Sequence, residues 1–544
     1  MTTFDYIVVG AGSAGCVLAN RLSADPGTTV LLIEAGGRDS TQLIKMPKGF
    51  GKLLGDPRYA WHYPVEPVGP TGRVEHWVRG RTLGGSSSVN GMVYNRGDRA
   101  DYDELERLGN PGWGWDTMLP VFRRIEDNAL GASEVRGAGG PLHISTASRP
   151  EPLCEEVIAA GTGLGWRRTD DLNASDDERI GYAMATIKNG QRFSAARAFL
   201  HPVAHRPNLT VAVDTLVTAV VTENGRAVGV RTRSEGQQTE VRARREVILS
   251  AGSIATPKIL QLSGIGPAET LKAAGIDVLV DSPHIGGRMR EHRCFVVQYR
   301  LGDNLGYNKA LSTPLRQGLS GLKYLTTRRG PLAAPAFDVI AFFKSRPELD
   351  RPDAQLLMAP VSLTPEIPGK ETGVEREPGV MGLGYILRPT AEGSLHITSA
   401  DPEAPLTITA NYYGSDHDRT VGTALFRRMR ELFETAPISG RITAETLPGP
   451  AVREDQEIID AGLEHGRCGY HAIGTCAMGP AEDDPVDAQL RVRGIEGLRV
   501  VDCSVMPTMV SGNLNAPIMA MAWRAADLIL QGEVITVAGS KRSG

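Results

Sequence analysis

The stretch YIVVGAGSAG, residues 6–15, decides the fold of this chain. Its first part, Tyr6–Val9, is an apolar, β-branched run that is typical of a buried strand. Three glycines then follow with the G-x-G-x-x-G spacing: Gly10, Gly12 and Gly15. Two of them let the backbone turn tightly and approach a pyrophosphate, and the third lets the next helix pack on the strand. The stretch therefore predicts a strand-turn-helix unit that binds phosphate.

The residues after the glycines extend this unit to a dinucleotide site. We predict a helix over Cys16–Leu22, whose N-terminus faces the phosphates, and a second buried strand over Val30–Ile33. Glu34 ends that strand, where an acid accepts a hydrogen bond from a ribose hydroxyl. These features predict an adenine dinucleotide, and both NAD and FAD fit them.

Length and composition exclude several classes of protein. A chain of 544 residues is too long for one core and predicts two domains. The formal net charge of -4 gives no electrostatic case for a nucleic-acid partner. We find no apolar run long enough to span a membrane and no secretory signal, although peripheral membrane contact stays open. The 6 cysteines are expected to be reduced thiols in a cytoplasmic monomer or homodimer.

Further along the chain, small residues gather at Gly84–Ser88, which we predict to be a loop with exposed amides. Arg81 precedes it, Asn90 lies just after it, and the apolar Met92–Tyr94 follows. A rigid loop laid against an anionic ligand that carries a ring would have this composition.

Turn and capping residues mark several later elements. Asn224-Gly225 predicts a hairpin, Glu246–Ser250 a strand, and Thr256-Pro257 the start of a helix. Residues from about 300 to 465 mix strands and helices without a phosphate-binding signature, and they read as a second domain that faces the substrate.

The C-terminal part is predicted to return to the first domain. Leu498–Val501 reads as a short buried strand that Asp502 closes. A buried helix is predicted over Ala516–Leu530, with Asn515 as its N-cap and Pro517 in its first turn.

Four stretches together resemble the glucose-methanol-choline (GMC) family of FAD-dependent oxidoreductases. GRTLGGSSSVNGMVYNRGDRADYD (residues 80–103) fits the first family signature, and GSIATPKILQLSGIG (252–266) fits the second. GYHAIGTCAMG (469–479) and VVDCSVMP followed by SGNLNAP (500–517) look like the active-site region. The likeness covers nearly the whole chain and is closest to the bacterial alcohol and choline dehydrogenase-like branch. It implies that the dinucleotide is FAD.

The resemblance implies a fold class that combines α/β and α+β parts. A discontinuous, Rossmann-like FAD-binding domain is expected over residues 1–155, 195–300 and 466–535. A substrate-binding domain, built on an antiparallel sheet flanked by helices, is expected over 156–194 and 301–465. Residues 536–544 are expected to be a flexible tail.

The resemblance also implies which residues hold FAD. The glycine loop would hold the pyrophosphate, Glu34 the adenosine ribose, the Val217 backbone the adenine, and Asp502 the ribityl or diphosphate region. The whole expected set is Gly10, Gly12, Ser13, Ala14, Gly15, Glu34, Ala35, Arg81, Thr82, Gly84, Asn90, Gly91, Met92, Val93, Val217, Ala251, Asp502, Ala516 and Pro517. Some members attach the flavin through a His at the place of Asn90, so we expect a non-covalent flavin here.

Catalysis is expected from two residues. An alcohol gives up a hydride readily only while a base removes its hydroxyl proton. His471 matches the catalytic His of the family and is the expected base, and Asn515 matches the second active-site position and would orient the hydroxyl. The helix that starts at Ala516 would point its positive end at the flavin. One departure concerns GGRMREH (286–292), where Glu291 replaces the usual Asp.

Two further sites are weighed. Cys468, His471 and Cys476 lack a fourth zinc ligand, and a zinc-bound His471 could not act as the base, so no metal is expected. Asp338 lies among apolar and aromatic residues. It either faces the pocket and binds a cationic or hydroxyl-rich end of the substrate, or is a structural carboxylate paired with Arg or Lys.

The expected reaction is oxidation of a primary alcohol, aliphatic or aromatic, to the aldehyde. Electrons would pass from the flavin to oxygen or to a quinone-type acceptor. The alternatives are a redox-silent, hydroxynitrile-lyase-like reaction on the same scaffold, a choline or amino-alcohol dehydrogenase, an NAD-linked dehydrogenase, and a flavin-binding protein without catalysis.

Overall fold

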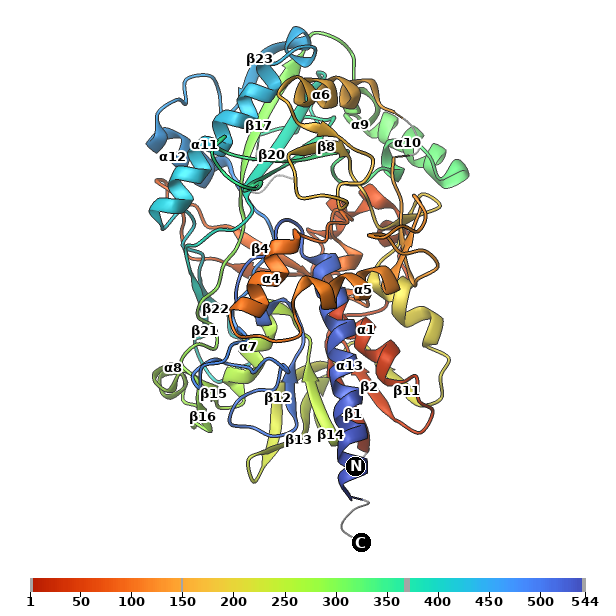
Figure 1. Ribbon diagram of the computed structural model, residues 1–544, viewed down its shortest axis with the longest axis vertical. Helices are drawn as coiled ribbons and strands as arrows, with labels where there is room; N and C mark the ends of the chain where they lie inside the picture. The colour runs from red at the N-terminus through yellow and green to blue at the C-terminus, as the bar shows by residue number, and fades with distance from the viewer. Residues whose placement is uncertain (1–2, 148–149, 366–371, 541–544) are drawn as a thin grey trace.

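The computed structural model of the chain describes residues 3–147, 150–365 and 372–540, and for 532–540 it describes the backbone alone. Two sheets form the frame of an elongated molecule, one in each half (Figure 1). Each sheet has its own set of covering helices. The chain passes between the two halves several times, so both are assembled from distant parts of the sequence.

The first sheet is 7-stranded and contains the predicted glycine-loop unit. Its strand order is β11-β2-β1-β14-β13-β12, and β25 also pairs with β14. The strands are β1 (Thr3–Val9), β2 (Val30–Ile33), β11 (Leu209–Ala212), β12 (Leu216–Glu223), β13 (Arg226–Ser234), β14 (Gln237–Leu249) and β25 (Leu498–Val500). β11, β2, β1, β14 and β25 run parallel, and β14, β13 and β12 run antiparallel. Parallel strands bring the ends of β1 and β2 to one edge, where the glycine loop begins.

Two predictions for this sheet are confirmed at the residue level. β2 has the predicted bounds, and all four of its residues are buried. The hairpin between β12 and β13 turns at Asn224 and Gly225, whose φ angles of 50° and 76° are those of a type I′ turn. A side chain tolerates this left-handed geometry poorly, which is why the Asn-Gly pair predicts the turn.

Helices of the first half begin earlier or end later than predicted. α1 (Ser13–Leu22) starts directly after Gly12 rather than at Cys16. α13 (Asn515–Ser540) includes Asn515 in its first turn and continues beyond Leu530. α13 therefore takes in residues 536–540 of the expected tail, while 541–544 lie outside the described residues.

The start of α7 (Gly252–Leu262) corrects the predicted cap at Thr256-Pro257. Pro257 lies inside the helix and cannot donate to the Ser253 carbonyl one turn back. That carbonyl instead accepts a hydrogen bond from the Thr475 hydroxyl at 2.8 Å. The Thr256 hydroxyl donates to Asp502 at 2.6 Å and accepts from the Ala251 amide at 3.1 Å, so it does not cap a helix that starts at Pro257. Thr475, far away in sequence, supplies the hydrogen bond that Pro257 cannot donate to the Ser253 carbonyl. The helix start predicted from Thr256-Pro257 is therefore misplaced.

The small-residue segment, predicted as a loop with exposed amides, contains a 3-10 turn (Gly85–Ser88) in which Gly85, Ser87 and Ser88 are buried. The Ser87 hydroxyl donates to the Gly84 carbonyl, and the Ser88 hydroxyl donates to the Leu83 carbonyl. The two hydroxyls donate to carbonyl oxygens that would accept from backbone amides in a longer helix. The turn is compact because its own side chains replace those amides.

The second sheet is 8-stranded, with the order β23-β17-β20-β19-β18-β8-β7 and with β24 beside β17. All pairs are antiparallel except β7 with β8. The strands are β7 (Arg167–Arg168), β8 (Arg179–Tyr182), β17 (Arg293–Leu301), β18 (Val339–Phe343), β19 (Ala354–Ala359), β20 (Gly379–Ile386), β23 (Ile442–Leu447) and β24 (Arg467–Cys468). β17 and β24 belong to this sheet although the expected boundaries at 300 and 466 place them in the FAD-binding domain.

Both faces of the second sheet are apolar. Along β17, Phe295 and Val297 pack against the helices α6 (Pro152–Gly163), α11 (Asp416–Glu434) and α12 (Asp455–His465). Cys294 and Val296 alternate with them and join a second cluster on the opposite face. That second face supplies one wall of the cavity described below.

The other described elements connect the two halves or cover their edges (Figure 1). The helices are α2 (Gln42–Lys45), α3 (Phe50–Leu53), α4 (Arg99–Arg107), α5 (Trp115–Ile125), α8 (Ala268–Ala273), α9 (Asn308–Leu311) and α10 (Pro314–Thr327). The strands form short two-stranded pairs: β3 (Ala60–Pro64) with β4 (His76–Gly80), β5 (Glu126–Asn128) with β6 (Leu142–Ile144), β9 (Ile187–Lys188) with β10 (Gln191–Arg192), β15 (Ile265–Gly266) with β16 (Val280–Asp281), and β21 (Ser394–Ile397) with β22 (Leu406–Thr409). No helix among the described residues combines the length and the hydropathy that crossing a bilayer requires.

Candidate active site

A cavity of about 1460 Å³ is lined from both halves of the molecule. Most of the residues expected to hold FAD lie in its wall, namely Gly10, Gly12, Ser13, Ala14, Glu34, Ala35, Asn90, Gly91, Met92, Val93, Val217, Ala251 and Asp502. The remaining expected residues do not line it: Gly15, Arg81, Thr82, Gly84, Ala516 and Pro517. The second sheet contributes apolar side chains from β19 and β20. One cavity thus joins a dinucleotide-binding loop to an apolar pocket.

The glycine loop has the shape that a pyrophosphate requires. A Cβ on Gly15 would overlap the Gly10 carbonyl oxygen, and a Cβ on Gly10 would lie 2.6 Å from the Ser250 carbonyl oxygen. Gly12 differs, because a Cβ there would come no nearer than 3.9 Å to Ser250, and Gly12 lines the cavity. Two glycines therefore allow backbone packing, and the third leaves room for a bound group. These residues fit the phosphates of FAD.

Glu34 lies in the cavity wall at the end of β2, as predicted, and it also holds the glycine loop. One carboxylate oxygen accepts a hydrogen bond from the Ala11 amide, and the other accepts from the Gly36 amide, each at 2.9 Å. Burial raises the pKa of Glu34 to about 7. The carboxylate has further lone pairs for a ribose hydroxyl.

His471 lies on a segment that pairs with the GGRMREH stretch. Arg290 and Ile473 exchange backbone hydrogen bonds, and the Gly469 amide donates to the His292 carbonyl at 2.7 Å. Glu291 accepts a hydrogen bond from the His471 amide at 2.6 Å, and its second oxygen lies 3.3 Å from Arg79. Glu291, which replaces the usual Asp, therefore fixes the backbone that carries His471.

The His471 ring lies between two polar side chains. Its Nδ1 is 2.8 Å from Nδ1 of His292, and its Nε2 is 3.2 Å from the amide nitrogen of Asn513. On the far side, Nε2 of His292 is 3.0 Å from the Leu387 carbonyl oxygen. The His292 ring also stacks on Tyr385, with ring centroids 4.4 Å apart.

These contacts fix the protons of both rings. A carbonyl oxygen only accepts, so Nε2 of His292 carries the proton and its Nδ1 is an acceptor. Nδ1 of His471 must then donate to His292, which leaves the lone pair of His471 on Nε2. Burial lowers the pKa of His292 to about 4. Burial, His292 and Arg79 hold the pKa of His471 well below 6.5, so both rings are neutral near neutral pH.

The amide beside His471 belongs to Asn513, two positions before the residue that is expected to orient the hydroxyl, Asn515. Asn515 is the first residue of α13, and its side-chain oxygen accepts a hydrogen bond from the Ser13 hydroxyl at 2.7 Å. Two positions earlier, before the helix begins, the chain directs Asn513 at His471. Asn515 still lines the cavity, where it joins α13 to the start of α1.

Sequence reasoning missed the residues that orient Asn513. Gln355 on β19 donates to the Asn513 oxygen at 3.3 Å, and the Tyr385 hydroxyl donates to Gln355 at 2.5 Å. In this series of hydrogen bonds, each side chain donates to the next one in the direction of His471. Asn513 lies inside the quoted SGNLNAP stretch and His292 ends the GGRMREH stretch, so both could have been found there. Gln355 and Tyr385 lie on strands and carry no motif.

Asn90 lines the cavity and is held by two hydrogen bonds. Its side-chain oxygen accepts from the Met92 amide at 3.0 Å and from Arg192 at 2.8 Å. Met92 adopts a left-handed φ of 63°, so the segment bends sharply here. The bend brings Asn90 and Met92 together in the cavity wall.

Asp338 does not line the cavity, so the structure gives no support to the first of its two expected roles, that of a substrate residue. It is buried, and the Tyr307 hydroxyl donates to one of its oxygens at 2.7 Å. Lys48 lies 3.7 Å from the other oxygen, and burial raises the pKa of this carboxyl group. The neighbours Ala336 and Phe337 face the cavity instead. The alternative of a paired structural carboxylate describes this residue.

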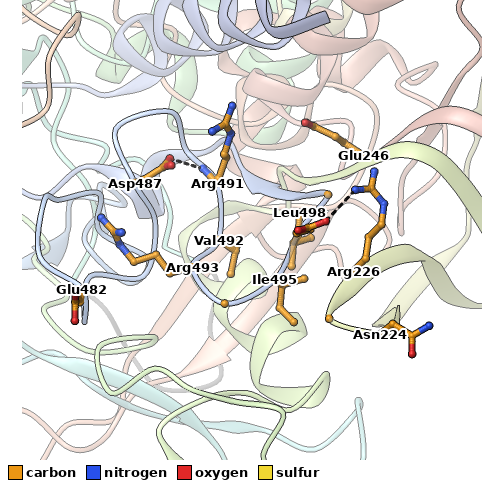
Figure 2. Close-up of a pocket in the computed structure, with 14 residues that line it drawn as sticks. Asn224, Arg226, Glu246, Glu482, Asp487, Arg491, Val492, Arg493, Ile495 and Leu498 are labelled. Atoms are coloured by element: carbon orange, nitrogen blue, oxygen red, sulfur yellow. Dashed lines mark hydrogen bonds and ion pairs between the residues drawn. The ribbon is translucent and has the colours of Figure 1, made fainter. Parts of the chain in front are cut away.

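A second, open cleft of about 840 Å³ lies near the β12–β13 hairpin (Figure 2). Two of its charged side chains contact other groups of the same cleft. Asp487 accepts from the Arg491 amide at 2.9 Å, and Arg226 lies 3.6 Å from Glu496. None of the residues of the glycine loop or the His471 segment lines this cleft. Within the described ranges, no three His, Cys, Asp or Glu side chains are arranged to hold a metal ion.

The fold and the cavity together define a dinucleotide-dependent oxidoreductase. A phosphate-binding glycine loop and a neutral histidine share one cavity with an apolar wall. Residues 4–294 and 389–522 match two family models described as GMC oxidoreductase. The chain therefore belongs to the GMC oxidoreductases, FAD is its cofactor, and it acts on CH–OH donors.

Curated relatives and solved structures agree with this assignment. The chain is 38% identical over 538 residues to an alcohol dehydrogenase [acceptor] of Pseudomonas putida, which covers 97% of this chain and 96% of that protein. It is 39% identical over 539 residues to the mitochondrial choline dehydrogenase of Mus musculus, with 97% and 89% covered. The crystal structure of pyridoxine 4-oxidase from Mesorbium loti is similar with a TM-score of 0.86 and 30% identity, covering 96% of this chain and 98% of that one.

Proposed function

We propose that the protein oxidises an uncharged primary alcohol, aliphatic or aromatic, to the aldehyde, with His471 as the general base. The observation that carries the proposal is that Nε2, the acceptor nitrogen of the His471 ring, lies in the wall of the FAD cavity. When bound, FAD supplies the hydride acceptor. The protein must supply a base within hydrogen-bond distance of the alcohol hydroxyl, which removes the hydroxyl proton.

Side chains of the protein position the alcohol and remove its proton. Nε2 of His471 takes the hydroxyl proton. Nδ1 of His471 keeps its own proton, which it donates in the hydrogen bond to His292. Without substrate, the Asn513 amide, held by Gln355, donates to the Nε2 lone pair. An alcohol hydroxyl that binds takes over the hydrogen bond to Nε2, and the Asn513 amide then donates to the hydroxyl oxygen. Asn515 and Ser13 connect this region to the glycine loop. We further propose that the expected cofactor residues in the cavity wall hold FAD as assigned above.

The wall opposite the glycine loop supports an uncharged substrate. It is formed by apolar side chains of the second sheet and its connections, namely Phe337, Leu357, Ala359, Val361, Met381 and Leu383. A quaternary ammonium group binds to a carboxylate or an aromatic cage. None of the described acidic side chains of the second sheet lines the cavity, and neither does Asp338, which accepts a hydrogen bond from Tyr307. The aromatic side chains that do line the cavity favour the cationic alternative instead; among them are Trp61, Tyr63, Phe337, Tyr385 and Tyr470. Choline and amino alcohols stay the alternative, because curated relatives carry the name choline dehydrogenase.

Anaerobic flavin reduction tests the proposal. Aliphatic, aromatic, amino and sugar alcohols are added to the oxidised holoenzyme, and the loss of visible flavin absorbance is followed. We expect aliphatic or aromatic alcohols to bleach the flavin at lower concentration than choline. Reoxidation by oxygen or by a quinone then identifies the acceptor. Bleaching by choline alone would contradict the uncharged-substrate proposal, and cleavage of a hydroxynitrile without bleaching would favour the lyase alternative.

The pH dependence follows from the lowered pKa of His471. The base must be neutral, so kcat/KM falls as pH drops through the pKa of His471 in the free enzyme. Because burial and the neighbouring Arg79 and His292 hold that pKa well below 6.5, we expect a plateau through neutral pH and an acid limb below pH 6.5. The measurement is the rate of flavin reduction at low alcohol concentration across pH. An acid limb at or above pH 6.5 would show that another group, or a charged His471, controls the step.

The flavin is expected to be non-covalent. Asn90 stands at the position where covalent relatives carry His, and an amide forms no such bond. Acid or heat precipitation of the yellow protein should therefore release intact FAD into the supernatant. Flavin that stays with the precipitate after denaturation would contradict this expectation, and chromatography of the released flavin against FAD provides the control.

A further inference from the structure

Helix α10 presents an apolar face to the solvent. Four leucines on it are exposed, with relative exposures of 76% for Leu315, 60% for Leu319, 61% for Leu322 and 53% for Leu325. Elsewhere among the described residues, large exposed apolar side chains occur singly, at Val74, Leu108, Leu279 and Tyr470. Scattered apolar residues are normal on a surface, but a row on one helix marks an interaction site.

The orientation of α10 is fixed from its opposite face. Residues spaced by three or four share a helix face, which groups Leu315, Leu319 and Leu322. Tyr324 lies on the other side, is buried, and donates to the backbone carbonyls of Lys45 and Gly190. The leucines therefore cannot turn inward without breaking this anchor. Figure 1 shows α10 at the periphery of the half that holds the 8-stranded sheet.

The segment around α10 carries charge of one sign. Residues 304–337 contain no Asp or Glu, while five basic residues lie among them: Lys309, Arg316, Lys323, Arg328 and Arg329. In the described part of the chain, these five make no ion pair. On a helical projection, Arg316 and Lys323 lie together along one side of the leucine row. The patch is basic although the whole chain has a formal net charge of -4.

We propose that the leucine row of α10 and its flanking basic residues dock the protein on an anionic lipid bilayer. The leucines enter the boundary between head groups and acyl chains, and the basic side chains lie among the phosphates. An amphipathic helix with an apolar face and basic flanks binds a bilayer surface in this way. α10 spans Pro314–Thr327, which suits a helix that lies on the bilayer rather than one that crosses it.

Helix α10 also forms part of the wall of the FAD cavity. Gln317 and Gly321, on the inner side of the helix, line the FAD cavity. A bilayer held against the outer side therefore lies next to the cavity wall. The segment also falls between the two family matches, which end at 294 and resume at 389, so this surface is a feature outside the matched regions.

Vesicle flotation of the holoenzyme tests the proposal. One set of vesicles contains phosphatidylcholine alone, and the other contains phosphatidylcholine with phosphatidylglycerol. We expect binding to the anionic vesicles that is at least about 10-fold tighter than to the neutral ones and that weakens with added salt. The variant Leu319→Gln/Leu322→Gln removes two leucines from the apolar row. The variant Arg316→Gln/Lys323→Gln removes the two positive charges beside it. Each should weaken binding at least about 10-fold.

Matched controls separate docking from misfolding and from self-association. Val74→Gln and Leu279→Gln change exposed apolar residues elsewhere and should leave vesicle binding unchanged. All variants should retain flavin content and the rate of flavin reduction by a water-soluble alcohol. Absence of wild-type binding to anionic vesicles, or binding that survives the leucine variant, would overturn the proposal. So would a leucine variant that converts a dimer to a monomer in sedimentation without any vesicle binding, because a second copy would then cover the row.

Discussion

Replacing His471 by alanine is expected to lower the rate of flavin reduction by alcohol by about 10² to 10⁴-fold, the range for loss of a general base. The lone pair on Nε2 is directed by the chain of contacts from the Leu387 carbonyl through His292, and no other neutral imidazole lines the described part of the cavity. Stopped-flow measurement under anaerobic conditions gives this rate directly. FAD content should survive, because the glycine loop is made by other residues.

A companion variant tests how the lone pair is directed. His292→Ala removes the acceptor of the Nδ1 proton, so His471 can carry its proton on either nitrogen. We expect a smaller loss than for His471→Ala, about 10-fold, together with a changed pH profile. A merely structural role of His292 would lower thermal stability and leave the pH profile unchanged. A His471→Ala enzyme within a factor of about three of wild type would show that another group takes the proton.

Replacing Gly15 by alanine is expected to abolish FAD binding. The new Cβ would overlap the Gly10 carbonyl oxygen, so the turn between β1 and α1 must open. The measurement is the ratio of flavin to protein after purification. Gly440→Ala is the matched control, because nothing lies within 4 Å of its added Cβ, and it should keep a full complement of FAD.

Gly12→Ala separates loss of the cofactor from loss of the fold. A Cβ at this position lies 3.9 Å from the nearest protein atom, so the apoprotein should fold. Because Gly12 lines the cavity, the added methyl group would meet the pyrophosphate in the FAD placement proposed above. We expect a soluble protein whose affinity for FAD is at least about 100-fold lower, measured by flavin titration of the apoprotein. Wild-type affinity in Gly12→Ala would contradict the placement of the pyrophosphate.

Much of the first half of the molecule is predictable because local chemistry determines it. The β-branched run before Gly10, the strand Val30–Ile33 and the Asn224-Gly225 turn each follow from neighbouring residues, and the structure contains all three. The family resemblance rests on four separated motifs, and the family matches confirm it. It also resolved the choice between NAD and FAD that the glycine loop left open.

The errors arise where distant residues satisfy local groups. Thr256-Pro257 has the chemistry of a helix start, yet Thr475 supplies the hydrogen bond that lets α7 begin at Gly252. Asn513 and Asn515 have the same side chain two positions apart, and only the start of α13 decides which one reaches His471. For Asp338 the sequence left two roles open, and only the contacts with Tyr307 and Lys48 distinguish a structural carboxylate from a pocket residue.

The central claim is that His471 abstracts a proton from an alcohol while the flavin is reduced. The most direct test is one anaerobic turnover of the holoenzyme with an aliphatic or aromatic primary alcohol, in which flavin absorbance and aldehyde are measured together. We predict that the flavin bleaches with one aldehyde formed per flavin, and that His471→Ala slows both by the same factor. Flavin that stays oxidised with every alcohol of the screen, in a protein that retains FAD and His471, would contradict the claim.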